Sequence, residues 1–198
     1  FTVQWPHLLR SHPGAEYAGR LYAEREVEHC RQSSALPPPA DLPELPAGAQ
    51  AGSSTAIVTI GSTKFDALIR AVDCLEFAQA LRRLGITKLK VQRGNGYMPA
   101  TLLCEEIASM LEVEVVDYTP SMPEEIRQAA LVISHAGAGT ILDCLQAGRR
   151  LVVVPNEGLM ANHQAQLGRA LQEQRLLLCR PAAELVAGLG EADFGALR

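Results

Sequence analysis

From Thr55 onward, short aliphatic runs alternate with segments whose apolar residues recur at helical spacing. The runs predict strands and the intervening segments predict helices. Strands of near-continuous aliphatic content are typical of a parallel sheet covered on both faces, in which each crossover is a helix. The pattern therefore predicts an α/β fold, a Rossmann-like doubly wound parallel sheet. The predicted strands are 56–60, 88–92, 113–117, 131–134, 151–154 and 176–179, and the predicted helices are 66–84, 101–111, 123–129, 140–147, 162–172 and 181–189.

Residues 1–54 have a different composition from the rest of the chain. They contain Pro37-Pro38-Pro39 and several further proline, glycine and serine residues. Such a composition favours an extended or disordered segment over a packed element. The remaining residues are enough for one substantial core and too few for two large domains. The predicted organisation is a Pro/Gly-rich N-terminal extension over residues 1–54 and a single domain over residues 55–198.

Charge and hydropathy exclude several classes of function. With 18 Lys and Arg against 22 Asp and Glu, the net charge of -4 provides no basic field for nucleic acid. No apolar run approaches the roughly 20 residues of a bilayer span, and residues 1–20 lack the apolar core of a signal peptide. We therefore expect a cytoplasmic chain with no transmembrane segment of its own. The five cysteines are scattered without a C-x-x-C pair, which favours free thiols over zinc or disulfides.

The loop His135-Ala-Gly-Ala-Gly-Thr140 stands between a predicted strand and a predicted helix. A helix start offers open backbone N–H groups and the positive end of the helix dipole, and glycine permits close approach. This loop predicts a phosphate-binding site, although a tight turn that needs glycine for its own geometry is the alternative. Leu142 replaces the third glycine of the dinucleotide fingerprint, and no Walker lysine pattern occurs. The predicted ligand is a phosphate ester other than NAD, and the chain is not expected to be a nucleoside triphosphatase.

Two further loops follow the first two predicted strands, at the edge where doubly wound folds bind ligands. Gly61-Ser-Thr-Lys-Phe-Asp66 supplies a glycine, two hydroxyls and a carboxylate at a helix start. The alternative there is a helix N-cap by Asp66, with Ser62 and Thr63 as turn residues. The segment Gly94-Asn-Gly96 follows the second strand and could be only a flexible turn.

The third predicted strand is followed by Tyr118-Thr-Pro-Ser-Met122. This segment is a candidate ligand contact, and its prolines could instead serve only to make the loop rigid. Ser121 precedes Glu124 by three residues, a spacing that predicts a capping box at the start of the next helix.

Four ordered motifs together resemble a known family. They occupy residues 57–66, 132–140, 151–157 and 159–164. They are similar to the catalytic subunits of the eukaryotic UDP-N-acetylglucosamine transferase, which are themselves relatives of the carboxyl-terminal, donor-binding domain of MurG-like GT-B glycosyltransferases. The resemblance covers roughly residues 55–180, and residues 1–54 find no match in it.

The resemblance implies half of an inverting, metal-independent GT-B enzyme that needs no cofactor and takes UDP-GlcNAc as donor. The implied reaction transfers N-acetylglucosamine to dolichol-diphosphate-GlcNAc, in lipid-linked oligosaccharide assembly at the cytosolic face of the endoplasmic reticulum. The acceptor half would be a membrane-anchored subunit of the asparagine-linked-glycosylation fourteen type. That partner would supply the base, so this chain would be active only in the complex. The alternative from another class is a non-catalytic nucleotide-sugar-binding or scaffolding subunit.

The resemblance also assigns site residues, with no metal ligand and no catalytic base on this chain. His135 could alternatively be a core-edge histidine bonded to a loop carbonyl, Asn162 a helix N-cap and His163 a solvated helix residue. The residues assigned to the donor diphosphate are Gly61, Ser62, Thr63, His135, Ala136, Gly137, Ala138, Gly139 and Thr140. Those assigned to uridine are Gly94, Tyr118, Thr119 and Met122. Those assigned to the ribose or the sugar are Asn156, Glu157, Asn162, His163 and Gln164.

Overall fold

The computed structural model of the chain describes residues 2–3, 16–17, 54–61, 63–156, 163–190 and 194–197. The chain divides into two compact units, Phe1–Leu42 and Pro43–Arg198. In the first unit, the strands β1 (Thr2–Val3) and β2 (Glu16–Tyr17) pair in parallel. The rest of the predicted N-terminal extension lies outside the described residues, apart from Ser54, so its character stays a prediction.

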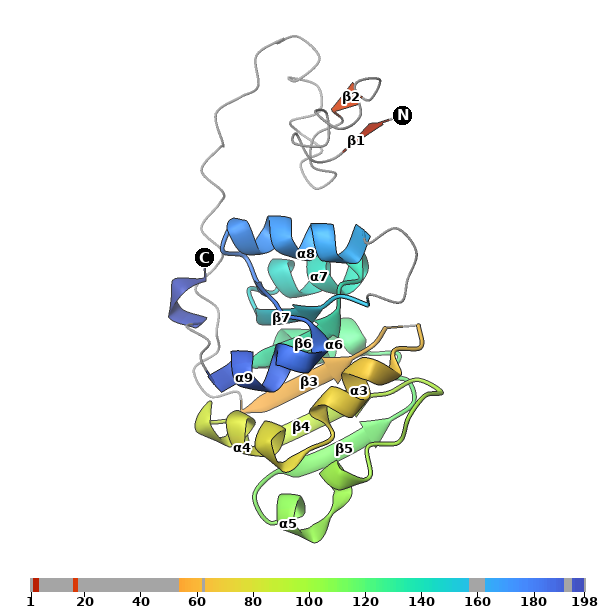
Figure 1. The fold of residues 1–198 in the computed structure, drawn as a ribbon, viewed down its shortest axis with the longest axis vertical. Helices are drawn as coiled ribbons and strands as arrows, with labels where there is room; N and C mark the ends of the chain where they lie inside the picture. The colour runs from red at the N-terminus through yellow and green to blue at the C-terminus, as the bar shows by residue number, and fades with distance from the viewer. Residues whose placement is uncertain are drawn as a thin grey trace. The chain divides into compact units, whose positions relative to one another are not determined.

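The second unit is built on a six-stranded parallel sheet in the order β5-β4-β3-β6-β7-β8 (Figure 1). The central strands β3 and β6 are neighbours, and the chain winds outward from them in opposite directions. This order is that of a Rossmann-like doubly wound sheet, which confirms the predicted fold class. The strands are β3 (Thr55–Thr59), β4 (Lys88–Gln92), β5 (Glu112–Val116), β6 (Leu131–His135), β7 (Arg150–Val154) and β8 (Leu178–Cys179).

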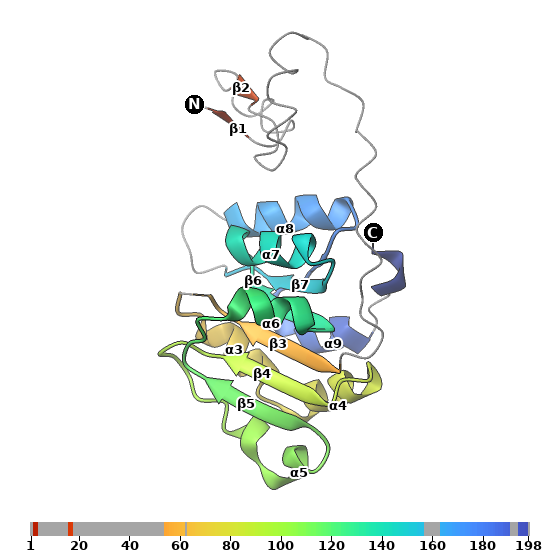
Figure 2. The ribbon, with the colours of Figure 1, turned by 180° about the vertical axis from the view of Figure 1, so that it is seen from behind.

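Helices cover both faces of this sheet. On one face lie α3, α4 and α9 (Figure 1), and α6 and α7 lie on the opposite face (Figure 2). The helix α8 packs next to β7 and β8. None of the helices in the described part of the chain is long and apolar enough to cross a membrane. The helices are α3 (Asp66–Val72), α4 (Leu75–Arg83), α5 (Glu105–Ala108), α6 (Met122–Gln128), α7 (Ala138–Gln146), α8 (His163–Glu173) and α9 (Leu185–Gly190).

The main core lies between the sheet and the layer of α3, α4 and α9. Alternate residues of β3, among them Ala56 and Val58, pack there with Phe77 of α4 and Leu185 of α9, and all four are fully buried. Ile57 points to the other face of the sheet and is 1% exposed. Because helices cover both faces, consecutive residues of the strand are all buried, which explains the aliphatic runs in the sequence.

The predicted helix over residues 66–84 is interrupted at Asp73 and Cys74, between α3 and α4. The Asp73 carboxylate accepts hydrogen bonds from the Tyr97 hydroxyl at 2.7 Å and from the Leu102 backbone N–H at 2.9 Å. These long-range bonds fix Asp73 in a non-helical conformation, with φ -81° and ψ 57°. Apolar periodicity continues across the interruption, so the sequence pattern gave no sign of it.

Two other predicted helices are shorter than expected. The segment 101–111 forms a 3-10 turn, Thr101–Leu103, and the single-turn helix α5, because Cys104 between them is extended with ψ 157°. The segment 181–189 begins with a 3-10 turn, Ala182–Glu184, before α9. Local periodicity identified the buried side of each segment but overestimated its helical length.

The predicted capping box at the start of α6 is wrong. Ser121 does precede the helix, but its side chain makes no cap hydrogen bond. Its hydroxyl instead donates to a carboxylate oxygen of Glu125 at 2.9 Å. The Glu124 side chain, which a capping box would turn back toward Ser121, is bonded to Arg127 and Gln128. Side chains within the helix and the preceding loop therefore replace the predicted cap.

Candidate functional site

The carboxyl ends of β3 and β6 meet at the centre of the sheet, where the direction of winding reverses. Doubly wound folds bind ligands in the crevice outside such strand ends. The loop that contains Gly61 follows β3, and the loop that contains Gly137 follows β6. The structure thus places these two predicted diphosphate-binding loops side by side.

The imidazole of His135 lies between the two loops. A Cβ atom on Gly61 would lie 2.4 Å from its Cε1 atom, and a Cβ on Gly137 would lie 2.3 Å from its Nε2 atom. Neither distance is compatible with a side chain, so both glycines leave room for the ring. Gly61 also has a φ of 62°, which other residues rarely adopt. Packing against His135 therefore accounts for these two glycines.

His135 itself is 8% exposed, and its Nδ1 atom has no hydrogen-bond partner among the described residues. Buried polar atoms in proteins nearly always have a partner, so this nitrogen stands out. Burial lowers the pKa of His135, and the nearby backbone of Thr59 opposes this only in part. The ring is thus neutral near pH 7, with one nitrogen that donates and one that accepts. A hydrogen bond to the Thr59 backbone raises the pKa, so the alternative of a core-edge histidine bonded to a loop carbonyl stays a prediction beside that of a diphosphate contact.

The helix α7 begins directly after this histidine. Its first intrahelical hydrogen bond runs from the Ile141 N–H to the Gly137 carbonyl at 3.1 Å. The amides of Ala138, Gly139 and Thr140 precede that bond and are therefore the open donors of the helix N-terminus. Gly139 is exposed, and a Cβ added there would meet no atom within 4 Å. Internal packing therefore does not require a glycine at this position, and its assignment to the diphosphate stays a prediction.

A buried network of polar side chains at the ends of β3 and β4 fixes the backbone of Gly61. The Thr59 hydroxyl donates to the Gln92 side-chain oxygen at 3.2 Å and accepts from the Gly61 N–H at 3.1 Å. The Gln92 amide nitrogen donates to the Gly61 carbonyl at 3.1 Å. Both backbone groups of Gly61 are therefore engaged within the protein. Sequence reasoning missed this pair, although a polar residue at the last position of two aliphatic strands was a usable signal.

The other described residues of the loop after β3 form hydrogen bonds that stabilise the loop itself. The Thr63 hydroxyl donates to the Ile60 carbonyl at 3.0 Å, as a turn residue would. Ser62 lies outside the described residues. The predicted N-cap by Asp66 is wrong, because Phe65 holds the cap position of α3. Asp66 instead accepts the Tyr97 N–H at 3.0 Å, and this hydrogen bond lowers the pKa of its carboxyl group.

The predicted uridine-binding residues are brought together at the ends of β4 and β5. The Gly94 N–H donates to the Asp117 carbonyl at 3.0 Å, which extends the pairing of the two strands into their loops. Tyr118 follows directly and is 70% exposed, whereas Thr119 is buried. Met122 is the first residue of α6. These loops border the central crevice, next to the loop after β3.

Of the predicted ribose and sugar contacts, two are joined by a hydrogen bond. The Gln164 side-chain oxygen accepts the Asn156 N–H at 2.9 Å, which connects the end of β7 with the start of α8. Glu157 and Asn162 lie outside the described residues. His163 is the first residue of α8, and the position of its side chain is likewise outside the described part. The assignments of these three residues stay predictions.

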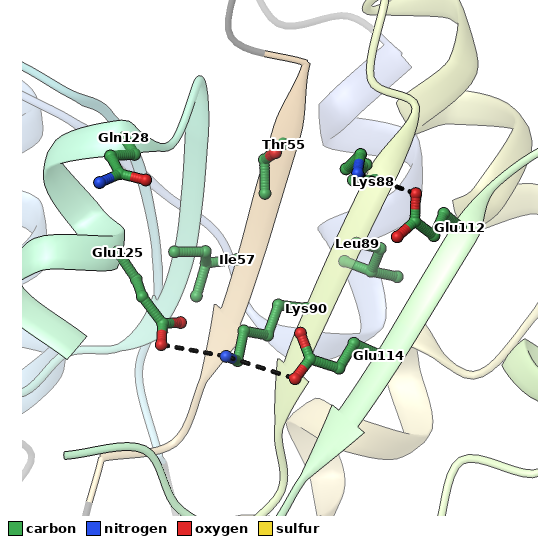
Figure 3. A pocket seen from close by; sticks show the side chains of 9 residues that line it. All are labelled: Thr55, Ile57, Lys88, Leu89, Lys90, Glu112, Glu114, Glu125 and Gln128. Atoms are coloured by element: carbon green, nitrogen blue, oxygen red, sulfur yellow. Dashed lines mark hydrogen bonds and ion pairs between the residues drawn. The ribbon is translucent and has the colours of Figure 1, made fainter. Parts of the chain in front are cut away.

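A hollow of about 350 Å³ lies away from this edge of the sheet (Figure 3). It is lined by the first residues of β3, β4 and β5 and by α6, at the amino-terminal half of the strands. Its charges are paired, with Lys88 to Glu112 at 3.0 Å and Lys90 to Glu114 at 3.5 Å. The hollow is thus not part of the crevice at the strand carboxyl ends. Across the described residues, no cluster of His, Cys, Asp and Glu is arranged to hold a metal ion.

A Rossmann-like sheet with an open helix N-terminus at its central crevice defines a nucleotide-binding type of domain. Residues 55–191 match the Glycosyltransferase family 28 C-terminal domain, and the chain belongs to this family. This finding agrees with the four sequence motifs and places them in one homologous domain.

The chain is similar to proteins named UDP-N-acetylglucosamine transferase subunit ALG13. It is 40% identical to that of Mus musculus over 149 residues, which are 70% of this chain and 12% of the relative. It is 39% identical to that of Homo sapiens over 139 residues, 66% of this chain and again 12% of the relative. For Yarrowia lipolytica the identity is 40% over 124 residues, 62% of each chain. The predicted family resemblance is confirmed, and the match spans only a small part of the mammalian relatives.

Solved structures have the same fold. The NMR solution structure of ALG13 superimposes with a TM-score of 0.58 at 28% identity, over 74% of this chain and 88% of that one. The crystal structure of Acinetobacter baumannii MurG gives a TM-score of 0.57 at 22% identity, over 71% of this chain and 40% of that one. The MurG likeness supports the predicted GT-B carboxyl-terminal type of domain at the level of fold.

The two glycines of the α7 loop should respond differently to alanine. Gly137→Ala is expected to lower the free energy of unfolding by about 1–3 kcal/mol, because the new Cβ displaces the His135 ring. Gly139→Ala is expected to maintain stability or raise it by up to about 1 kcal/mol, because alanine has the higher helix propensity. Denaturant unfolding of both variants measures the difference. Equal stabilities would contradict the packing of His135 against Gly137.

Burial of His135 should make stability depend on pH. In the unfolded chain this imidazole titrates near its ordinary value of 6.5, whereas its pKa in the folded protein is lower. As the pH falls through 6.5, the unfolded state gains a proton that the folded state does not, so the free energy of unfolding decreases. Between about pH 7.5 and about pH 5.5, the wild type should lose more stability than His135→Gln in urea unfolding. A loss of the same size in both proteins would contradict this assignment.

Proposed function

We propose that this chain is the donor-binding subunit of a UDP-N-acetylglucosamine transferase. It binds UDP-GlcNAc in the crevice at the carboxyl ends of β3 and β6. Together with a membrane-anchored acceptor-binding subunit, it transfers N-acetylglucosamine to dolichol-diphosphate-GlcNAc. The names of its relatives and the four motifs support the choice of donor.

One observation carries the proposal: the open N-terminus of α7 follows Gly137, which packs against the imidazole of His135 at the central strand ends. The amides of Ala138, Gly139 and Thr140 provide donors for phosphate oxygens, reinforced by the helix dipole. Gly139 leaves space for the diphosphate to reach the backbone.

The transfer step needs stabilisation of the leaving group. The acceptor hydroxyl oxygen forms a bond to the anomeric carbon as the bond from that carbon to the phosphate oxygen breaks. UDP departs with the electron pair, and the N-terminus of α7 stabilises its negative charge without a metal ion. Attack on the face opposite UDP inverts the configuration. A base takes the hydroxyl proton, and we assign that base to the partner subunit.

The other loops are assigned to the uridine and the sugar. Uracil lies against the loop after β5, where the exposed Tyr118 and the neighbouring backbone reach it. Glu157 contacts the ribose or a sugar hydroxyl. Asn162, His163 and Gln164 contact the hydroxyls of the N-acetylglucosamine. Because the Gln164 side-chain oxygen is bonded to Asn156, its amide nitrogen is the group that donates to the sugar.

The division of labour is supported by the names of the relatives, which are called subunits of a transferase. Residues 55–191 match one carboxyl-terminal domain of the family. A dolichol-linked acceptor is held in a membrane. A membrane-anchored partner at the cytosolic face of the endoplasmic reticulum would bring the acceptor to the donor.

Uridine nucleotides should bind the chain and stabilise it. UDP or UDP-GlcNAc at about 100 times its dissociation constant should raise the free energy of unfolding by about 2.7 kcal/mol. The melting temperature then rises by roughly 5–10 °C, whereas ADP and NAD should give smaller shifts. Gly139→Val should abolish the shift by UDP, because its side chain occupies the approach to the amides.

A matched control is Gln146→Val, which introduces the same side chain at an exposed position at the far end of α7. This variant should retain the UDP response, and circular dichroism should be unchanged in both variants. An equal response of the wild type to ADP or NAD would exclude the uridine assignment. A full UDP response in folded Gly139→Val would exclude the phosphate site at α7.

Transfer activity should require the partner. We expect no turnover when the purified chain is given UDP-GlcNAc and the lipid acceptor alone, and turnover when the membrane-anchored subunit is added. Formation of labelled chitobiosyl lipid measures the activity. Turnover by the chain alone would refute the split enzyme. Donor binding without turnover in either condition would favour the alternative of a non-catalytic nucleotide-sugar-binding or scaffolding subunit.

A further inference from the structure

The loop between β5 and α6 is tied to a single carboxylate oxygen. Thr119 is 7% exposed, although Tyr118 before it is 70% exposed. The Thr119 hydroxyl donates to Oε1 of Glu125 at 2.7 Å, and the Ser121 hydroxyl donates to the same oxygen at 2.9 Å. Glu125 lies on α6, so the loop that precedes the helix is fastened back onto it.

Glu125 is in turn held by the sheet. The Lys90 Nζ atom, from β4, lies 3.0 Å from Oε1 of Glu125 and 3.5 Å from Oε1 of Glu114 (Figure 3). The Lys90 and Glu125 side chains are only 18% and 21% exposed, so water screens their attraction less than on an open surface. Removal of Lys90 would leave the partly buried Glu125 carboxylate without its charge partner, whereas removal of Glu125 would leave Lys90 paired with Glu114 alone. Strand, helix and loop are thus joined through one carboxylate.

Both groups are charged at neutral pH. Burial raises the pKa of Glu125, but hydrogen bonds from Thr119, Lys90 and Ser121 outweigh it, so the pKa is lower than usual. Burial likewise lowers the pKa of Lys90, but Glu125 and Glu114 more than offset it, so the pKa is raised. The contact between Glu125 and the loop therefore does not depend on small changes of pH around neutrality.

The start of the same loop is also fixed, since the Asp117 carbonyl accepts the Gly94 N–H at 3.0 Å. With Thr119 held by Glu125, the exposed Tyr118 between these two points has little freedom of position. A rigid loop discriminates between bases better than a mobile one, because it cannot rearrange its hydrogen-bonding groups to suit a base that does not match them. A loop that reads a base by its backbone depends on such support.

We propose that Glu125 is a positioning residue for base selection: its carboxylate, held by Lys90, fixes Thr119 and so sets the loop that meets the uracil. This inference rests on the proposed function. It assigns the preference for a uridine nucleotide partly to a side chain on the far side of the loop from the ligand. The diphosphate contacts at α7 are independent of it.

Isothermal titration calorimetry with UDP, ADP and inorganic pyrophosphate tests the proposal. Glu125→Ala should weaken UDP binding about tenfold and change ADP and pyrophosphate binding by less than about twofold. Thr119→Val should weaken UDP binding in the same selective way. The double variant should lose no more than Glu125→Ala alone, because both substitutions remove the same contact.

Glu124→Ala is the matched control, since the partners of the Glu124 carboxylate among the described residues are Arg127 and Gln128, on the exposed side of α6. It should bind all three ligands like the wild type. Equal weakening of UDP, ADP and pyrophosphate by Glu125→Ala would indicate a general structural role and overturn the proposal. Unchanged UDP binding in folded Glu125→Ala would also overturn it. If Glu125→Ala fails to fold, Thr119→Val decides: the ratio of its dissociation constants for UDP and ADP is compared with that of the wild type.

The same titrations distinguish a refutation of the proposed function from a refutation of this inference. A wild type that binds UDP no better than ADP would refute the uridine site itself, and with it the role of Glu125. A wild type that prefers UDP, together with variants that keep the same preference, would refute only the role of Glu125.

Discussion

The contact of the His135 imidazole with Gly61 and Gly137 is the constraint on which the arrangement of the site depends. It joins the loops of the two central strands, and it works only because neither loop carries a side chain at that point. The Thr59 and Gln92 side chains complete the support by engaging both backbone groups of Gly61. A buried polar network of this kind is stable only when its members are paired, and the Thr59 and Gln92 side chains pair with each other and with Gly61.

The structure separates groups that build the crevice from groups that are open to a ligand. The hydroxyl of Thr63 and the backbone of Gly61 are used within the protein, whereas the amides at the start of α7 precede its first hydrogen bond. The proposed recognition of phosphate therefore rests on the backbone of α7 more than on the loop after β3. This difference follows from helix geometry, since the first turn of any helix lacks internal acceptors for its N–H groups.

The two sides of the β5–α6 loop serve different purposes. Tyr118 is exposed on this loop, whereas the neighbouring Thr119 is buried and bonded to Glu125. The ion pair of Glu125 with Lys90 lies on the sheet face beneath, in the charged hollow of Figure 3. Charges that are remote from the ligand can thus control the position of a loop that touches it, because a partly buried ion pair is costly to break.

The sequence by itself determined the parallel doubly wound sheet, since aliphatic runs separated by helical periodicity leave few other arrangements. It also predicted a phosphate site at the α7 loop, because glycines between a strand and a helix are typical of such sites, and this assignment stays a prediction. It did not reveal the interruption at Asp73, the role of Asp66 or the failure of the capping box at Ser121, since each depends on partners outside the local pattern. Only the tertiary structure distinguished Gly137, which makes room for His135, from Gly139, which faces open space. The two glycines look alike in the sequence, and what differs is the atoms that the fold brings next to each.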